Sequence, residues 1–274
     1  MSKIGTEAKT VFKEASLTMF TLLKIMVPIS IIVRTLKAIG AIEILGDFLG
    51  PVMRVVGLPG ESGFVWATAM VTNIYGGLVA FFSMAARDPL TIAQVTVLST
   101  MILVAHNLPV ELRIAQKAGA ALWFILLLRI SAAFALGWML NIIYSLSGFL
   151  QNNASILWKP AEEAPSLFHW ITGELKNYGV IFLIILALIS LMRALASVGA
   201  IELLNRFLKP MLESVGMSKA AAPLAMVGMT IGLSYGGGLI INEARSGVLT
   251  KKDVFLSMAL MGMSHGLVED TLLM

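Results

Sequence analysis

Long apolar stretches alternate with short polar ones along this chain, and several are long enough to cross a membrane. The clearest apolar stretches cover residues 16–33, 63–86, 90–105, 120–150, 179–195 and 220–241. A membrane-spanning helix needs about 20 predominantly apolar residues. The pattern therefore predicts an all-α, polytopic integral membrane protein.

Two other stretches alternate apolar and polar positions with the period of a helix. They cover residues 42–54 and 201–215, and each contains a proline. This pattern is typical of short amphipathic helices that lie at the membrane interface. The first 15 residues mix basic and acidic side chains and precede no small-residue cleavage site. We expect them to form an amphipathic lead-in that is retained, rather than a signal peptide.

The second half of the chain repeats the first. Residues 34–58 align without gaps on residues 193–217, and 12 of these 25 positions are identical. The same offset of 159 places His106 on His265 and Glu111 on Asp270, whereas Tyr75 falls on Tyr235 after one inserted residue. Chance similarity between apolar segments would match Leu, Val and Ala rather than these residues. We therefore predict an internal duplication.

The duplication sets the predicted domain boundaries. The first repeat covers residues 16–118, a long transmembrane helix with a polar loop covers 119–174, and the second repeat covers 175–274. Transporters are often built from two such halves, with the substrate site at their interface near the bilayer midplane. The repeats are parallel if the segment around Tyr75 spans the membrane, and inverted if it forms a re-entrant hairpin. The sequence leaves both topologies open.

Composition narrows the possible chemistry. Of the 274 residues, 58% are hydrophobic, 13% are charged and none is cysteine, and the formal net charge is +4. The lack of cysteine excludes disulfides, thiolate metal sites and iron–sulfur clusters. The modest positive charge indicates basic loops beside lipid headgroups rather than nucleic-acid binding. Because the chain has no phosphate loop, HExxH motif or nucleophile elbow, we expect no enzymatic activity and no organic cofactor.

Two clusters of histidine and acidic residues end apolar stretches at equivalent positions of the repeats. The candidate residues for a substrate or ion pathway here are His106, Asn107, Glu111, His265, Glu269 and Asp270. A single histidine at a helix end is more often an interfacial group. Ionisable groups buried in a membrane, however, usually mark ion or proton pathways. The paired imidazoles and carboxylates could bind a divalent metal, with His106 and His265 as ligands, or relay protons.

Glycine-rich breaks in the apolar stretches give a second set of candidates. They comprise Asn73, Tyr75, Gly76 and Gly77 in the first repeat and Ser234, Tyr235, Gly236 and Gly237 in the second. Small residues also permit close helix packing, which is the alternative interpretation. We expect these segments to unwind and to line a cavity as well as a packing seam.

Further charged residues could form a gate. Glu43 and Glu202 follow Gly-Ala-Ile in the two amphipathic segments, and Arg34 and Arg193 lie nearby. The alternative is that the two acids lie on a solvated helix face. Arg129 lies inside the long apolar stretch, where we expect it to be paired or to extend toward the interface, although an anion-binding role is also open.

The repeated Gly-Ala-Ile-Glu segment, the glycine-broken helices and the His-Gly-Leu-Val-Glu-Asp ending resemble the Gate, or nucleoside-recognition, domain family. Its relatives include the spore maturation proteins A and B and the membrane part of ferrous-iron transporter B. The resemblance covers nearly the whole chain and implies a permease or gating role. We carry no nucleoside-binding residue over, because the family's label is itself an analogy.

These observations together predict a transporter of a small polar solute or ion, with its site between the repeats, in the cytoplasmic membrane of a prokaryote. A divalent-metal permease and a non-transporting scaffold of an envelope complex are the alternatives. The second repeat lacks a counterpart of the long 120–150 helix. We therefore expect a second copy of the chain, or another Gate-family subunit, to cover the exposed face, with lipid around the remainder.

Overall fold

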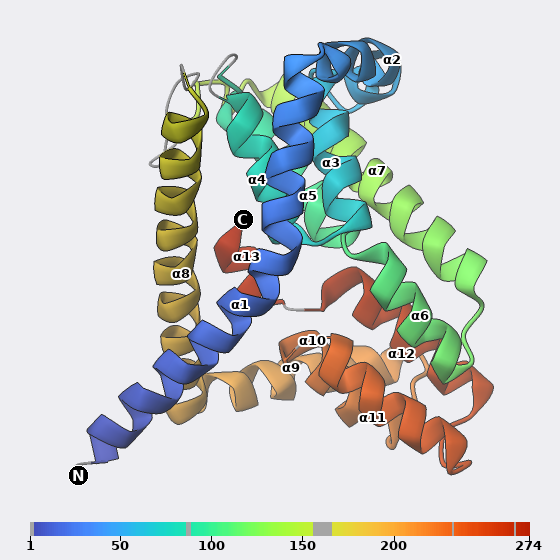
Figure 1. Ribbon diagram of the computed structural model, residues 1–274. Helices are drawn as coiled ribbons and strands as arrows, with labels where there is room; N and C mark the ends of the chain where they lie inside the picture. The colour runs from blue at the N-terminus through green and yellow to red at the C-terminus, as the bar shows by residue number, and fades with distance from the viewer. Residues whose placement is uncertain (1–2, 86–88, 156–165, 232, 266) are drawn as a thin grey trace. The chain divides into compact units, whose positions relative to one another are not determined.

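The computed structural model describes residues 3–85, 89–155, 166–231, 233–265 and 267–274 (Figure 1). Nearly all of these residues are helical, and the only β pairing among them is an isolated bridge between Thr91 and Asn153. The prediction of an all-α protein is confirmed. The helices are α1 (Lys3–Ala38), α2 (Ala41–Val55), α3 (Glu61–Val71), α4 (Ile74–Ala85), α5 (Ile92–Val104), α6 (Leu108–Ala118), α7 (Leu122–Ser147), α8 (Leu167–Ser197), α9 (Ala200–Ser214), α10 (Ala221–Ile231), α11 (Leu233–Arg245), α12 (Lys251–Ser264) and α13 (Glu269–Leu273).

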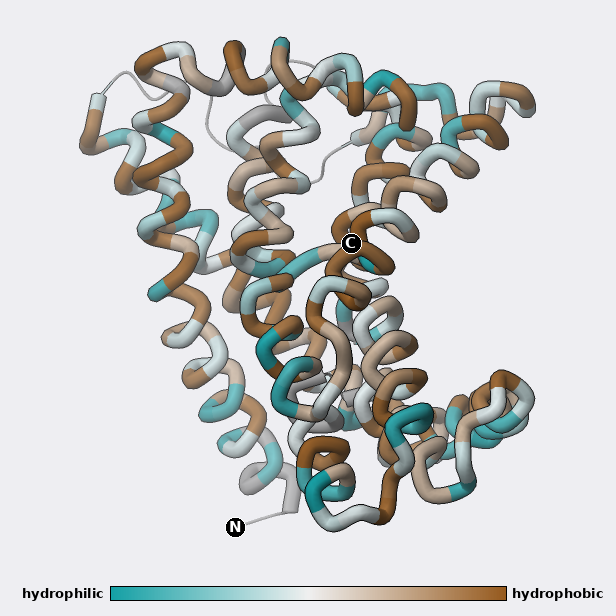
Figure 2. Tube along the Cα trace, turned by 90° about the vertical axis from the view of Figure 1, so that its right-hand side faces the viewer, coloured by the Kyte–Doolittle hydropathy of each residue, from teal (hydrophilic) through white to brown (hydrophobic). Residues whose placement is uncertain are grey.

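Four segments of the described chain are long and apolar enough to cross a membrane. They are Lys9–Leu36, Ile92–Ala118, Leu122–Ser147 and Leu167–Ser197. The lead-in and the first apolar stretch form one continuous helix, α1. Figure 2 shows several hydrophilic residues in the part of this helix that lies toward the N-terminus. The third and fourth segments coincide with α7 and with α8. The second combines α5 and α6, which are separated by a break at Ala105–Asn107.

The apolar stretch predicted at 63–86 is divided between two short helices. Helices α3 and α4 meet at Thr72–Asn73 and pack on each other, so that a Cβ at Gly77 would lie 2.8 Å from the Cβ of Ala69. At 1.5 Å per residue each helix is only about 17 Å long, against about 30 Å of bilayer hydrocarbon. The pair therefore forms a helical hairpin whose arms are each too short to span a membrane alone.

The chain divides into two compact units. The first comprises residues 1–99 and 136–191. In this unit α1 packs on α4, α4 on α3, and α3 on α2. The apolar core includes Met26 and Val33 of α1 together with Met53 and Val65, all nearly fully buried.

The second unit comprises residues 100–135 and 192–274. Here α10 packs on α11 and α12, and α6 packs on α11. Two glycines allow the close approach of these helices. A Cβ at Gly228 would lie 2.1 Å from Met261 of α12, and one at Gly237 would lie 2.4 Å from Ile114 of α6. In this unit, small residues therefore permit close helix packing, as the sequence predicts.

Helix bounds recur along the chain at nearly the predicted offset. Helix α2 begins and ends 159 positions before α9, and α1 ends 159 positions before α8. A left-handed glycine precedes each amphipathic helix, Gly40 with φ 69° and Gly199 with φ 75°. Only glycine adopts this conformation without a steric penalty.

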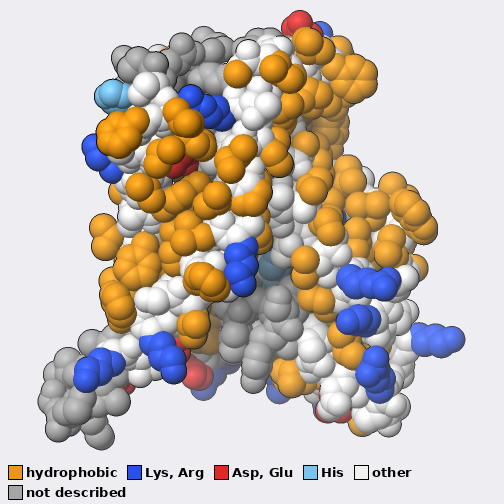
Figure 3. Space-filling model, in the orientation of Figure 1, with side chains coloured by type: hydrophobic (Ala, Val, Ile, Leu, Met, Phe, Trp, Pro, Cys, Tyr) orange, Lys and Arg blue, Asp and Glu red, His pale blue; other side chains and the backbone are white. Residues whose placement is uncertain are grey.

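The two amphipathic helices also expose apolar side chains at equivalent positions. These are Ile44, Phe48 and Val52 of α2, and Leu203, Phe207 and Met211 of α9. Figure 3 shows apolar side chains gathered over α2, at its upper right. An exposed apolar stripe opposite a polar face is the property expected of helices that lie in the membrane interface.

Candidate functional site

The candidate site lies in the second unit, where helices α5 and α12 end at a polar cluster. Helix α5 stops at Val104 because Asn107 adopts a left-handed conformation with φ 50° and Pro109 occupies the second position of α6. Proline lacks an N–H and its ring collides with the carbonyl four residues before it, so α5 cannot continue into α6. The break leaves His106 near the centre of the apolar segment Ile92–Ala118.

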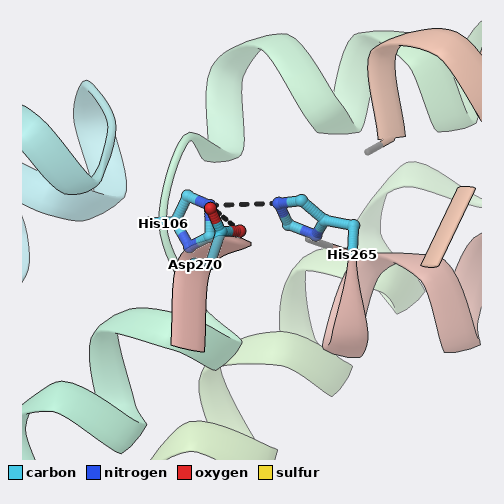
Figure 4. A group of neighbouring side chains, drawn as sticks. All are labelled: His106, His265 and Asp270. Atoms are coloured by element: carbon cyan, nitrogen blue, oxygen red, sulfur yellow. Dashed lines mark hydrogen bonds and ion pairs between the residues drawn. The ribbon is translucent and has the colours of Figure 1, made fainter. Parts of the chain in front are cut away.

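Two histidines face each other across the cluster. The Nε2 atoms of His106 and His265 are 3.0 Å apart, and their ring centroids are separated by 4.7 Å. Figure 4 shows the two rings pointing toward one another, with Asp270 beside His106. His106 is buried and the His265 side chain is only 8% exposed. The two histidines that the sequence alignment pairs therefore lie side by side.

The second ring nitrogen of each histidine is held in the same way. Nδ1 of His106 lies 2.9 Å from the carbonyl of Ile102, and Nδ1 of His265 lies 3.0 Å from the carbonyl of Met261. A carbonyl oxygen can only accept, so each Nδ1 carries a proton and donates it. In the neutral form of each ring, Nε2 is then the nitrogen without a proton, and both Nε2 atoms point into the cluster.

Two carboxylates complete the polar cluster. Oε1 of Glu111 lies 3.0 Å from Nε2 of His265 and 3.8 Å from Nε2 of His106. Oδ2 of Asp270 lies 3.9 Å from Nε2 of His106. Glu111 is 3% exposed, and its Oε1 has no aligned hydrogen-bond donor among the described residues.

Arg129 of α7 secures the cluster from one side. Its Nη1 is ion-paired with Oε2 of Glu111, its Nε donates to the carbonyl of Val104 at 2.9 Å, and its Nη2 donates to the carbonyl of His106 at 3.0 Å. The interrupted helix leaves carbonyls without intrahelical partners, and Arg129 satisfies two of them. Of the roles that the sequence left open for Arg129, the structure shows pairing, with the whole side chain buried.

The glycine-rich candidates are placed differently from our expectation. The break in the first half lies at Thr72–Asn73, and Tyr75, Gly76 and Gly77 are already helical in α4. Asn73 caps that helix, because its Oδ1 accepts the Gly76 N–H at 2.9 Å. The backbone of Ser234, Tyr235, Gly236 and Gly237 is helical in α11. The expectation of an unwound stretch at these glycines is therefore wrong, because they serve close helix packing.

Of the predicted gate residues, the structure describes the side chains of Arg34, Arg193 and Glu202. Arg34 of α1 lies over the ring of Trp170, with its Cζ 4.7 Å from the centroid. Arg193 and Glu202 are exposed on α8 and α9. The side chains of Glu43 and Glu269 lie outside the part of the chain that the structure describes, as does residue 266 beside His265. The gate remains a prediction.

Sequence comparisons place the chain among membrane proteins. Residues 19–124 match the model of the Gate family, which is described as "Nucleoside recognition". The chain is 28% identical over 260 residues to the uncharacterized membrane protein YvoD of Bacillus subtilis, an alignment that covers 93% of this chain and 81% of that protein. No solved structure matches the chain.

Proposed function

We propose that this chain, of which residues 19–124 match the Gate family and four segments are apolar enough to cross a membrane, is a permease for a small cation. One observation carries the proposal. Two histidines and two carboxylates converge where a candidate membrane span is broken near its centre. Ionisable groups are costly inside a bilayer and usually mark an ion or proton pathway.

The charge of the cluster favours a cation over an anion. With neutral imidazoles, the charges of Glu111 and Asp270 exceed that of Arg129 by one negative unit. Helices α5 and α12 end at the cluster and α6 begins there, so two carbonyl ends and one N–H end point toward it. The C-terminal end of a helix carries partial negative charge and stabilises a cation. A proton or a metal ion therefore fits this site better than an anionic solute does.

An internal duplication gives the pathway its architecture in this proposal. Four pairs of features at an offset of 159 support it. The first two are the bounds of α2 and α9 and the left-handed glycines Gly40 and Gly199. The third is the hydrogen bond that His106 and His265 each make to the carbonyl four residues earlier. The fourth pair is a capping arrangement at the start of α5 and of α12. Each repeat contributes one histidine, as in transporters whose site lies between two halves.

In this proposal the protein lies in the cytoplasmic membrane of a prokaryote, and its role is transport rather than catalysis. A second copy or a Gate-family subunit remains a prediction, as does a non-transporting scaffold as the alternative function. Only uptake measurements separate a permease from a scaffold.

The test is cation flux in proteoliposomes made from the purified full chain. A pH-sensitive dye inside the vesicles reports protons, and a metal-sensitive dye reports divalent cations. We expect saturable uptake of at least one of these cations above protein-free vesicles. In His106→Ala we expect a loss of at least about tenfold, since loss of even an outer support of a metal ligand lowers affinity or activity by about 10–100-fold. His169→Ala is the matched control, because His169 is exposed and lies in the other unit. Absence of uptake for every cation would overturn the proposal in favour of the scaffold.

A further inference from the structure

The two facing imidazole nitrogens need a positive species between them. Both Nδ1 protons are committed to backbone carbonyls, so both Nε2 atoms direct lone pairs into the same space at a separation of 3.0 Å. Two lone pairs at this distance repel each other unless a proton or a metal ion lies between them. The carboxylate Oε1 of Glu111, only 3.0 Å from one of these nitrogens, adds further negative charge.

We propose that this space is a binding site for a divalent transition-metal ion, with Nε2 of His106, Nε2 of His265 and one carboxylate oxygen of Asp270 as ligands. These three ligand atoms lie within 4.8 Å of one another. Metal–ligand distances of about 2.0–2.2 Å place tetrahedral ligand atoms about 3.3–3.5 Å apart. The nitrogens at 3.0 Å and the His106–Asp270 pair at 3.9 Å bracket that value. Because the remaining pair, His265 and Asp270, is bounded only by the 4.8 Å limit, side-chain shifts of about 1 Å would close the site around an ion.

The ligand set selects the class of metal. Neutral imidazole nitrogens prefer borderline ions such as Zn²⁺, Co²⁺ and Fe²⁺, whereas Mg²⁺ and Ca²⁺ prefer sites made of oxygen atoms alone. The hydrogen bonds from Nδ1 to the carbonyls of Ile102 and Met261 supply the outer support that metal-bound histidines usually have. Because this support is the same in both histidines, each ring is already oriented with Nε2 toward the ion.

Glu111 and Arg129 set the charge beside the proposed metal site. Oε2 of Glu111 is occupied by Arg129, whereas Oε1 faces the two histidines and lacks an aligned donor among the described residues. When the His265 ring is neutral, its Nε2 lone pair faces this oxygen at 3.0 Å, and a buried carboxylate oxygen in that position is costly. A metal ion between the histidines would stabilise this oxygen. Oε1 of Glu111 would either bind the ion as its fourth ligand or be attracted by its positive charge without direct contact.

This inference deepens the proposed function by naming the cation, but its test does not depend on transport. The full chain is purified in detergent, freed of metal with a chelator and titrated with Co²⁺, whose absorption is intense in tetrahedral sites. We expect one equivalent to bind and Zn²⁺ to displace it. Since loss of an outer support residue alone costs 10–100-fold in metal affinity, loss of a direct ligand in His106→Ala or His265→Ala should cost about 100-fold or more.

Asp270→Asn is the second variant, because Asp270 is partly exposed and the amide has nearly the same shape, so this replacement threatens folding least. It should bind Co²⁺ more weakly and with an altered spectrum, and His169→Ala should bind as the wild type does. If wild type and the histidine variants bind Co²⁺ alike, or if wild type binds none, the metal site is refuted. Proton flux would then still support the permease, with a shared proton between the histidines. Metal binding without flux of any cation would support the site and refute the permease.

Discussion

At the scale of single residues, Arg129 shows how a charge is accommodated in an apolar helix. The guanidinium distributes its donors between one carboxylate and two carbonyls exposed by the break in α5. Its planar group has five donors in a fixed geometry, whereas the lysine ammonium has three on one atom. Arginine is therefore suited to satisfy three acceptors that lie in different directions.

Replacing Arg129 should destabilise the protein strongly. Breaking a buried ion pair by removing one partner costs about 3–5 kcal/mol, because the other charge remains buried. We expect Arg129→Leu to lower the thermal midpoint in detergent markedly, and Arg129→Lys to lower it less. Arg113→Leu is the matched control. Arg113 is exposed on α6, and its guanidinium donates to the side chain of Gln116 rather than to a buried carboxylate. Equal midpoints for Arg129→Leu and Arg113→Leu would contradict this assignment.

The sequence predicts part of this residue-level site and misses the rest. The meeting of His106 and His265 is what the predicted duplication leads us to expect, because equivalent positions of two repeats tend to lie around one axis. The pairing of Arg129 with Glu111 is a contact between separate helices, and no periodic pattern encodes it. A single arginine in an apolar stretch signals that a partner exists but does not identify it.

At the scale of elements, the helices that lead into the site begin in the same way in both halves. Thr91 and Gln94 exchange hydrogen bonds at the start of α5, and Thr250 and Asp253 do so at the start of α12. This reciprocal arrangement is a capping box. In the second half Asp253 also accepts the backbone N–H of Ser218 at 2.8 Å, which ties the start of α12 to the loop between α9 and α10.

The second capping box should make stability depend on pH. Burial raises the pKa of Asp253, but hydrogen bonds from Thr250 and Ser218 outweigh it and hold that pKa below its ordinary value. The stabilisation is therefore complete above the ordinary carboxyl pKa and is lost as the pH falls through the lowered one. Asp253→Asn should cost about 1 kcal/mol at neutral pH. Its difference from wild type should shrink in acid.

Gln94→Ala provides the comparison for this measurement, because an amide does not titrate in that range. Its cost, read from unfolding in detergent over the same pH series, should stay constant. A difference between wild type and Asp253→Asn that does not change with pH would show that the carboxylate contributes nothing to the cap as an ion.

The element boundaries that the sequence mispredicts have a physical cause. Glycines at 76–77 and 236–237 suggest unwinding, because glycine weakens a helix by about 1 kcal/mol relative to alanine. Close packing offsets that cost here, as Gly77 meets Ala69 and Gly237 meets Ile114. The actual break follows Thr72, whose hydroxyl bonds to the Thr68 carbonyl, and Asn73 then starts α4. Such local side-chain bonds compete with the helix.

At the scale of the whole molecule, the short hairpin decides the expected topology. If α3 and α4 do not span, three candidate spans precede α8: Lys9–Leu36, Ile92–Ala118 and Leu122–Ser147. An odd number of crossings places the starts of α1 and α8 on opposite faces, so the two repeats are inverted. Within the first unit, contacts of Phe12 with Phe182 and of Ser30 with Glu174 agree with antiparallel α1 and α8.

Inverted repeats make a prediction for equivalent residues of the amphipathic helices. The chain has no native cysteine, so single cysteines can be labelled selectively. Asp47→Cys on α2 and Arg206→Cys on α9, 159 positions apart and both exposed, should react with a membrane-impermeant maleimide from opposite faces of the membrane. Phe48→Cys and Phe207→Cys, on the apolar stripes, should react at least about tenfold more slowly because lipid covers them. Labelling of both polar positions from the same face would establish parallel repeats instead.

The central claim is that water and cations reach a polar cluster inside the bilayer. The most direct measurement is the reaction of Ser264→Cys, beside His265, with a small cationic thiol reagent in right-side-out and inside-out vesicles. Ser257→Cys, two turns earlier on α12 and fully buried, is the matched control. We predict that Ser264→Cys is modified, that the modification blocks cation flux and that Ser257→Cys does not react. A Ser264→Cys variant that is inert from both faces, or that is modified without any loss of flux, would contradict the account.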